Sequence, residues 1–266
     1  VLQDAASTTS ATESPEWEAL IDTATSLPSL PPLLSKAIDA AIPSLAGEIP
    51  DSVLLRWSMR RLPEINASFN ANTRDESTRF AAILALQASA YAYRFATPRH
   101  SVQLVRKALD LGRHRFHAND PKPVRGALNL LLAKLLEDSS PKEAFDAARM
   151  ATHIFRQPPP DDRTIAYATL LTATLGERLN LAHWEKDADQ AERSFLHHTW
   201  AVSDSPEANR DLTNAYLQLS EIWEETNPKR ALVLTSKAYR LAKEQLQAGG
   251  SPSRHRDLAK SARRYA

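Results

Sequence analysis

An internal repeat of 43 or 44 residues limits what this chain can fold into more than any other feature of its sequence. A dipeptide that starts with a small residue or leucine recurs at Ser89, Leu132, Leu175 and Leu219, and a bulky residue follows four positions later, at Tyr93, Leu136, Leu179 and Trp223. A second series has small residues at Ser101, Ala144, Ala188 and Ala231, followed seven positions later by Ala108, Ala151, Phe195 and Ala238. Such spacings share one helix face, where small residues let two helices approach closely. The repeat therefore predicts stacked pairs of helices.

Composition favours helices over strands. The 266 residues include 42 alanines and 35 leucines, which are good helix formers, but only seven valines and nine isoleucines, which are enriched in strands. With six glycines, the chain has few residues for the turns of a β-sandwich or the phosphate loop of a nucleotide-binding domain. We therefore predict an all-α protein.

Prolines mark where the helices begin. Seven of the 17 prolines follow a short polar residue that can cap a helix: Pro15, Pro98, Pro121, Pro141, Pro206, Pro228 and Pro252. A proline at the first helical position lacks only an N–H that would have no partner there, and the polar side chain before it accepts another orphan N–H. Ser140 and Glu143 also have the spacing of a capping box.

The apolar periodicity between these signals predicts eight helices, at residues 77–95, 98–117, 123–138, 141–156, 162–180, 184–202, 206–225 and 228–247. Short polar or proline-containing loops join them, so consecutive helices are expected to be antiparallel neighbours. Residues 1–14 are predicted to be a disordered tail. Prolines divide residues 15–70 into short helices, which form an N-terminal cap or a degenerate repeat. Residues 252–266 are predicted to be a C-terminal capping helix or the start of a further repeat.

The repeat resembles the tetratricopeptide repeat, which has Leu-Gly and then a large apolar residue in its first helix and two alanines seven residues apart in its second. The third pair matches this pattern at Leu175, Gly176, Leu179 and Ala188, and the fourth matches it at Leu219, Trp223, Ala231 and Ala238. The resemblance covers residues 77–247 and implies a right-handed α-solenoid of four antiparallel helix pairs behind a Pro-rich helical cap. The period is about nine residues longer than usual for the family. HEAT-type or other helical-hairpin repeats and a non-repetitive bundle are therefore the alternatives.

The resemblance also implies a binding surface, the concave groove lined by the first helix of each pair. Transferring the groove positions by register gives Gln87, Tyr91 and Arg94 in the first pair, Leu130, Lys134 and Glu137 in the second, Ala173, Glu177 and Asn180 in the third, and Asn214, Leu217, Glu221 and Glu224 in the fourth. Such a groove is basic and aromatic at one end and acidic at the other. We expect it to hold a peptide whose acidic part faces the first pair and whose basic part faces the fourth.

Charges alternate in blocks along the chain, although the net charge is only +1. Residues 1–50 carry seven acids and one base, 51–135 six acids and 14 bases, 136–225 17 acids and eight bases, and 226–266 two acids and ten bases. In a repeat array such blocks become surface bands, which attract a complementary partner or favour self-association. A further docking patch is expected at Arg99, Arg106, Lys107, Arg113 and Arg115. The basic band at 94–125 makes nucleic-acid binding an alternative function.

Catalytic and metal-binding patterns are weak. The absence of cysteine excludes a disulfide framework, a thiolate zinc site and a cysteine nucleophile. His114 and His117 are one helical turn apart, but no third ligand follows and the neighbouring arginines repel a cation. The chain has no phosphate-binding glycine loop, no serine nucleophile elbow and no HExxH motif. We therefore expect no enzyme, no cofactor and no metal site.

These patterns together predict a scaffold or adaptor that holds a peptide, another protein or another domain of its parent chain. The main alternative is a sensor or regulatory region of a larger effector protein, for example one with a protease domain. No apolar run approaches about 18 residues, and the first residues lack the pattern of a secretory signal. We therefore expect an intracellular protein, cytoplasmic or nuclear, without a membrane segment.

Overall fold

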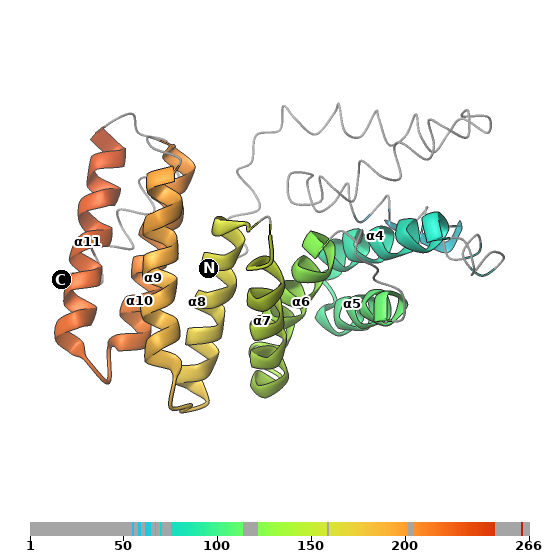
Figure 1. The fold of residues 1–266 in the computed structure, drawn as a ribbon, viewed down its shortest axis with the longest axis horizontal. Coiled ribbons are helices and arrows are strands. Elements are labelled where there is room, and N and C mark those ends of the chain that lie inside the picture. Colours follow the sequence, from blue (N-terminus) through green and yellow to red (C-terminus); the bar gives the residue numbers. More distant parts are fainter. Residues whose placement is uncertain are drawn as a thin grey trace. The chain divides into compact units, whose positions relative to one another are not determined.

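Eight α-helices make up most of the described part of the chain in the structure, a computed structural model (Figure 1). The described residues are 76–113, 122–158, 160–201 and 205–247, with separate positions between 55 and 70 and at 262. The chain divides into two units, residues 1–135 and 136–266. The first unit holds α4 (Glu76–Tyr93), α5 (Pro98–Arg113) and all but the last residue of α6 (Lys122–Leu136). The second holds α7 (Pro141–Phe155), α8 (Asp162–Arg178), α9 (Trp184–Ala201), α10 (Pro206–Trp223) and α11 (Pro228–Gln247).

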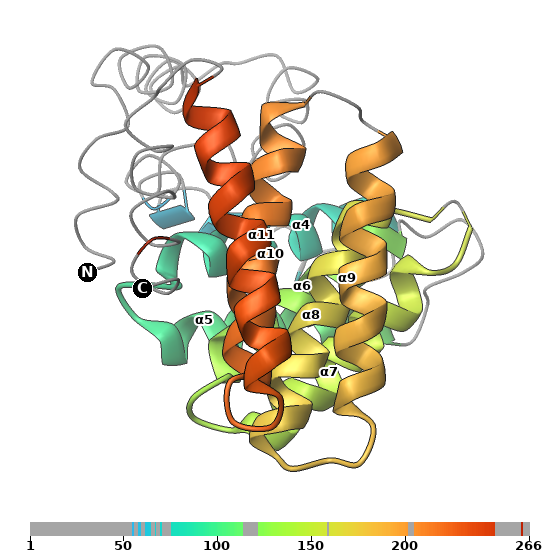
Figure 2. The same cartoon turned by 90° about the vertical axis from the view of Figure 1, so that its left-hand side faces the viewer.

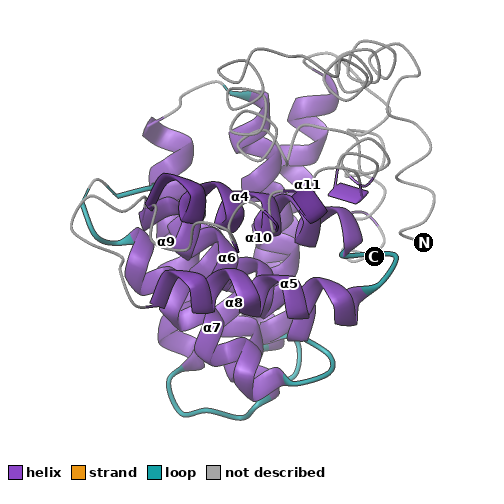
Figure 3. Ribbon diagram, turned by 90° about the vertical axis from the view of Figure 1, so that its right-hand side faces the viewer, coloured by secondary structure: helices purple, strands orange, loops and turns teal. Residues whose placement is uncertain are grey.

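The described residues confirm the all-α prediction, since Figure 3 shows only helices and loops among them. Each helix begins within one residue of its predicted start and ends at or before its predicted end. Where the residues after a helix are described, as at 94–95, 137–138, 179–180 and 224–225, the apolar pattern continues into residues that form a turn. None of these helices is both long and apolar enough to cross a membrane. The predictions for residues 1–14, for most of 15–70 and for 252–261 and 263–266 fall outside the described residues.

Capping and proline place the helix starts. Pro98, Pro141, Pro206 and Pro228 are each the first residue of a helix, as the sequence predicts. The Ser205 hydroxyl accepts a hydrogen bond from the Ala208 N–H at 3.3 Å, and the Asn227 side-chain oxygen accepts one from the Arg230 N–H at 3.1 Å. Asp161 caps α8 in the same way, through the Thr164 N–H. Each of these side chains accepts a hydrogen bond from a backbone N–H of the first turn, which has no partner within the helix.

The predicted capping box at Ser140 is wrong. Ser140 precedes α7, but its hydroxyl accepts no hydrogen bond from the first turn of that helix. Its backbone, at φ −153° and ψ 67°, differs from that of Ser205, which caps α10 at φ −72° and ψ 120°. The Ser140 side chain therefore makes no capping bond, and Pro141 is the first residue of the helix.

In the first unit, α4 and α5 pack against each other (Figure 1). The contact depends on small residues. Ser89, Ala90 and Ser101 are fully buried, and the Ser101 hydroxyl donates to the Ala90 carbonyl at 2.7 Å. A larger side chain at these positions would hold the two backbones apart. The helices of the first predicted pair therefore contact each other at the small residues of the repeat.

In the second unit, each helix packs on its neighbour in the chain or on the next but one. α8 packs against both α7 and α9, α10 packs against α11, and α10 also contacts α8 and α9. Figure 1 shows α8 and α10 running in the same direction, and Figure 2 shows α11 alongside α10. One core joins α8 to α11, with Trp184, Phe195 and Trp223 among its largest buried side chains. The apolar faces of two successive helix pairs thus form a single core.

Burial follows the repeat. The predicted small positions in the second helix of each pair are all buried: Ser101, Ala144, Ala188 and Ala231, with Ala108, Ala151, Phe195 and Ala238. The bulky positions Leu136 and Trp223 are also buried, whereas Tyr93 and Leu179 are half-buried. The spacing that defines the repeat in the sequence is therefore the spacing of the core in space.

Gly176 allows a close approach between α8 and α9. A Cβ atom placed on this residue would lie 3.0 Å from the Cβ of Trp184 and 3.5 Å from Cε2 of Phe145. The Trp184 atom is next to the backbone and cannot swing away as a flexible side chain could. Only glycine lets Trp184 pack this closely, where its ring lies 4.7 Å from that of Trp223.

We predict that Gly176→Val lowers stability by about 2–3 kcal/mol, because the added methyl groups force α8 and α9 apart in a close-packed core. The measurement is the urea midpoint followed by circular dichroism. Thr174→Val is the control, since Thr174 is half-buried on the same helix and the substitution introduces the same valine without this clash. Equal midpoints for the two variants would contradict the close approach.

Candidate functional site: the α8–α10 face

Two stripes of partly or fully exposed side chains run along α8 and α10, and together we call them the α8–α10 face. On α8 the stripe consists of Arg163, Tyr167, Leu171, Thr174 and Arg178, and on α10 of Arg210, Asn214, Gln218 and Glu221, with Glu225 in the turn that follows. Spacings of three and four residues keep each stripe on one side of its helix. Because α8 and α10 pack against each other, the stripes lie on neighbouring helices.

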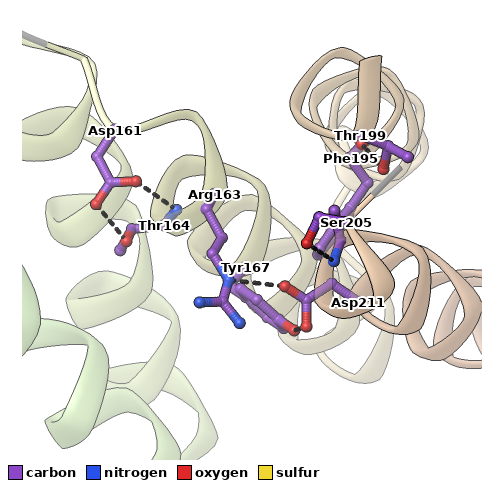
Figure 4. Close-up of polar contacts among 9 residues, drawn as sticks. Asp161, Arg163, Thr164, Tyr167, Phe195, Thr199, Ser205 and Asp211 are labelled. Atoms are coloured by element: carbon purple, nitrogen blue, oxygen red, sulfur yellow. Dashed lines mark hydrogen bonds and ion pairs between the residues drawn. The ribbon is translucent and has the colours of Figure 1, made fainter. Parts of the chain in front are cut away.

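The carboxylate of Asp211 joins the two helices at the edge of this face (Figure 4). It accepts a hydrogen bond from Nε of Arg163 at 2.7 Å and one from the Tyr167 hydroxyl at 2.6 Å. The Asp211 side chain is only 10% exposed, so its charge is removed from water and needs both partners. These bonds bring the first turns of α8 beside the second turn of α10.

Tyr167 also belongs to the core. Its ring meets that of Phe195 edge to face, with 5.0 Å between the centroids. Burial raises the pKa of Tyr167 well above its usual value, and the bond to Asp211 raises it further, because an ionised phenol would face a carboxylate. The residue thus couples the apolar core to the polar face.

Arg163 is held by one edge of its guanidinium group. Its Nε donates to Asp211, and 54% of its side chain is exposed. Figure 4 shows both terminal nitrogens without a dashed line. The hydrogen bond to Asp211 raises the pKa of Arg163, so the group stays protonated. The half-exposed guanidinium group thus places N–H donors at the edge of the α8–α10 face.

The C-terminal end of the α8–α10 face is acidic. Glu221, Glu224 and Glu225 are exposed in the last turn of α10 and the turn after it. The one arginine of the stripe at this end of α8, Arg178, donates to the Glu137 carbonyl at 2.9 Å and to the Asp138 carboxylate at 3.1 Å. It offsets acids of the turn before α7, so the charge at this end remains negative.

A further set of ion pairs joins α9 to α11. Arg230 pairs with Asp189 and Glu192, and Lys237 pairs with Glu192 at 2.8 Å. The guanidinium carbon of Arg230 lies 4.2 Å from the ring centroid of Trp223. Such partly exposed pairs fix the alignment of helices more than they stabilise them. Asp189 and Glu192 of α9 are thus paired with bases of α11.

Most of the groove residues predicted for the second unit are accessible, but Leu217 is not. Glu221 and Glu224 are exposed, whereas Asn214, Glu177 and Glu137 are half-buried. The prediction of Leu217 as a groove residue is wrong, because its side chain is 8% exposed and belongs to the core cluster. Ala173 is fully buried in the same cluster. The transferred register assumes that the helix sides with Ala173 and Leu217 face outward. In the structure these two residues belong to the core that α8 and α10 share.

Asn180, another predicted groove residue, is exposed but ends α8. Its φ of 53° is in the left-handed region, which asparagine tolerates better than most residues. The Asn180 N–H donates to the Glu177 carbonyl and the Leu181 N–H to the Gly176 carbonyl, both at 2.8 Å. This is the Schellman arrangement, which satisfies two carbonyls at a helix C-terminus. The left-handed backbone at this helix end therefore accounts for an asparagine at position 180.

The groove residues predicted for the first unit are mostly half-buried. Gln87, Tyr91, Arg94 and Leu130 are half-buried, and Lys134 is exposed. Burial raises the pKa of Tyr91, which Arg94 opposes. Nη1 of Arg94 donates to the Tyr91 carbonyl at 2.6 Å, so this cation is held against its own helix.

The predicted basic patch is partly described. Arg99, Arg106 and Lys107 are exposed on α5. Arg113 is the last residue of that helix, and its side chain lies outside the described part, as do Arg115, His114 and His117. Within the described part, no group of three or more histidines and carboxylates could hold a metal ion.

Comparisons with known proteins bear on the fold alone. No family model matches the chain, and a search of curated proteins gives no match. Among solved structures, the chain is similar to the crystal structure of BtubC (BKLC) from P. vanneervenii, with a TM-score of 0.57. The similarity covers 82% of this chain and 86% of BtubC, at 14% sequence identity. The two proteins therefore share the arrangement of their helices, and at this identity nothing more follows.

Sequence reasoning missed Arg163, Tyr167 and Asp211. The repeat could have revealed them, because their separations in the sequence are close to one period: Tyr167 and Asp211 are 44 residues apart, and Arg163 and Asp211 are 48 apart. Other polar links of this unit span similar distances: Arg178 to Asp138 spans 40 residues, and Lys237 to Glu192 spans 45. Pairs of complementary side chains about one period apart would have identified these links.

We predict that Tyr167 and Tyr216 ionise later than free tyrosine when absorbance at 295 nm is followed against pH. Burial raises the pKa of Tyr216 to about 12, and the pKa of Tyr167 is raised further. A raised pKa favours the neutral phenol in the folded state, so this contribution to stability is complete below about pH 10 and is lost above it. Tyr167→Phe should remove one late-titrating group and reduce the loss of stability at alkaline pH. Six groups titrating together near pH 10 in the folded chain would contradict the burial.

Proposed function

We propose that this chain is a non-enzymatic scaffold whose tetratricopeptide-like helix pairs stack as an α-solenoid and bind a protein segment on the α8–α10 face. One observation carries the proposal: helices one repeat apart lie side by side and present parallel polar stripes. Their spacing is fixed by the link from Asp211 to Arg163 and Tyr167. A rigid pair of stripes is the kind of preorganised surface that binds an extended or helical segment without ordering itself first.

Packing supports the stacked arrangement. α10 contacts both helices of the preceding pair, α8 and α9, while α11 packs on α10. The polar links of this unit join residues about one period apart, as repetition of one contact along an array requires. In such an array the first helices of successive pairs form an inner layer, which is the layer that contains α8 and α10.

Charge defines the partner. Arg163 and Arg210 lie toward the N-terminal ends of the two helices, and Glu221 and Glu224 lie at the C-terminal end of α10. The charge of the face thus changes from positive to negative along the helix axes within this unit. The proposed partner segment is polar, with a hydrogen-bond acceptor over Arg163 and basic side chains over Glu221 and Glu224. Complementary charges of this kind increase association rate and select among partners.

The test is capture of partners from a native lysate by the wild-type chain and by Glu221→Lys/Glu224→Lys, followed by calorimetry with the partner identified. We predict that the double variant loses the partner, with binding about tenfold weaker or more. Both residues are exposed, so the thermal midpoint should change little.

Glu185→Lys/Glu244→Lys is the matched control. It makes the same change in net charge at two exposed glutamates, one on α9 and one on α11. Retention of the partner by this control, with loss in the α10 variant, would support the α8–α10 face as the site. Equal retention by both variants would place binding elsewhere and contradict the proposal. Equal loss would show a general charge effect and contradict it as well.

A further inference from the structure

Phe95, in the turn between α4 and α5, is the most exposed of the large apolar side chains in the described part of the chain, at 73%. Its ring is held in place, because the guanidinium carbon of Arg94 lies 4.4 Å from its centroid. Arg94 in turn donates to the Tyr91 carbonyl. An aromatic ring fixed in water loses little entropy on binding and gains from burial of its free side, so it is suited to be an anchor.

A basic stripe begins beside this ring. Arg99, Gln103 and Arg106 are exposed on α5 at spacings of four and three residues, and Lys107 is exposed next to them. The first turn of α5 holds no acidic residue, so the positive end of the helix dipole adds to these charges. We call Phe95 together with this stripe the Phe95 surface. It combines an apolar anchor with positive charge.

The sequence contains a segment with the opposite chemistry. Residues 13–22 carry Glu13, Glu16, Glu18 and Asp22, and the first base of the chain is Lys36. Between the acids lie Trp17, Leu20 and Ile21, at spacings of three and one. The segment thus supplies both negative charges and large apolar side chains within ten residues.

We propose that residues 13–22 dock on the Phe95 surface of the same chain, with the apolar group Trp17, Leu20 and Ile21 against Phe95 and the acids along the basic stripe. Reach is no obstacle, because the 53 residues between this segment and α4 could span far more than one domain at about 3.3–3.6 Å per residue. Docking would cover the exposed ring and neutralise the stripe.

The Phe95 surface fits an acidic segment better than a nucleic acid. The stripe from Arg99 to Arg106 covers eight residues, about 10 Å of helix, which is enough for only two or three phosphates. Asp110 follows on the same helix face and ends this basic stretch. The exposed ring adds an apolar contact that Trp17 can match.

The chain has no cysteine, so a disulfide can report proximity without interference. In the full chain, Ser14→Cys/Gln103→Cys should form an internal disulfide about tenfold faster than Ser14→Cys/Gln218→Cys, because docking raises the effective concentration of the two thiols. Gln218 is the control because it is an exposed glutamine on α10. Non-reducing gels and mass spectrometry distinguish internal bonds from dimers.

Two sets of variants separate docking from a change in fold. Phe95→Ser or Arg99→Glu/Arg106→Glu should lower the rate to that of the control, with an unchanged thermal midpoint because these side chains are exposed. Glu16→Lys/Glu18→Lys, added to the charge-reversed chain, should restore it, which a purely structural effect would not do.

Three results would overturn the proposal. Equal rates for the two cysteine pairs would show that the segment does not dock. Disulfide-linked dimers without the internal bond would assign the surface to a second copy of the chain. Binding of a labelled single-stranded oligonucleotide that depends on Arg99 and Arg106, with the disulfide rate at the control value, would assign it to nucleic acid.

Discussion

A pair of amphipathic helices cannot bury its apolar face alone, and the architecture of the second unit follows from that constraint. The core beneath α8 to α11 is continuous: Leu170 of α8, Phe195 of α9 and Trp223 of α10 belong to one buried cluster. Each helix pair therefore completes the core of its neighbour. Small residues at fixed positions, with Gly176 the extreme case, allow the approach that makes this core dense.

Polar links then fix the alignment that burial alone leaves open. Asp211 is nearly buried, and it is satisfied only when α8 and α10 bring Arg163 and Tyr167 to the correct height. A slide of one helical turn would leave a charged group without partners in a poorly solvated position, which costs several kcal/mol by the usual order of magnitude. The exposed stripes on either side of this link are thereby held in one relation to each other, which is what a binding surface for an extended segment needs.

Helix positions could be predicted closely because they depend on local chemistry. Pro98, Pro141, Pro206 and Pro228 each start a helix as the sequence indicates, and the small residues of the repeat are buried. Ser140 differs from this pattern because a cap depends on the backbone angles before the helix as well as on the residue type. Those angles are set by the loop and by packing.

The candidate site could be predicted only in part. Glu221 and Glu224 are accessible, as the transferred register implies, but Leu217 is in the core. Register transfer assumes that every helix turns the same arc outward, whereas the arc is decided by how α8 and α10 rotate to bury their largest side chains. The link through Asp211 is long-range, and its partners lie 44 and 48 residues away, so no local pattern reveals it.

A double-mutant cycle tests most directly whether the link through Asp211 holds successive helix pairs in fixed alignment across one repeat. Tyr167→Phe, Asp211→Asn and the double variant would be unfolded in urea, with the wild-type chain as reference. We predict a coupling energy of about 1–3 kcal/mol between the two positions. Additive effects, with a coupling of zero, would show that the link does not hold the pairs together.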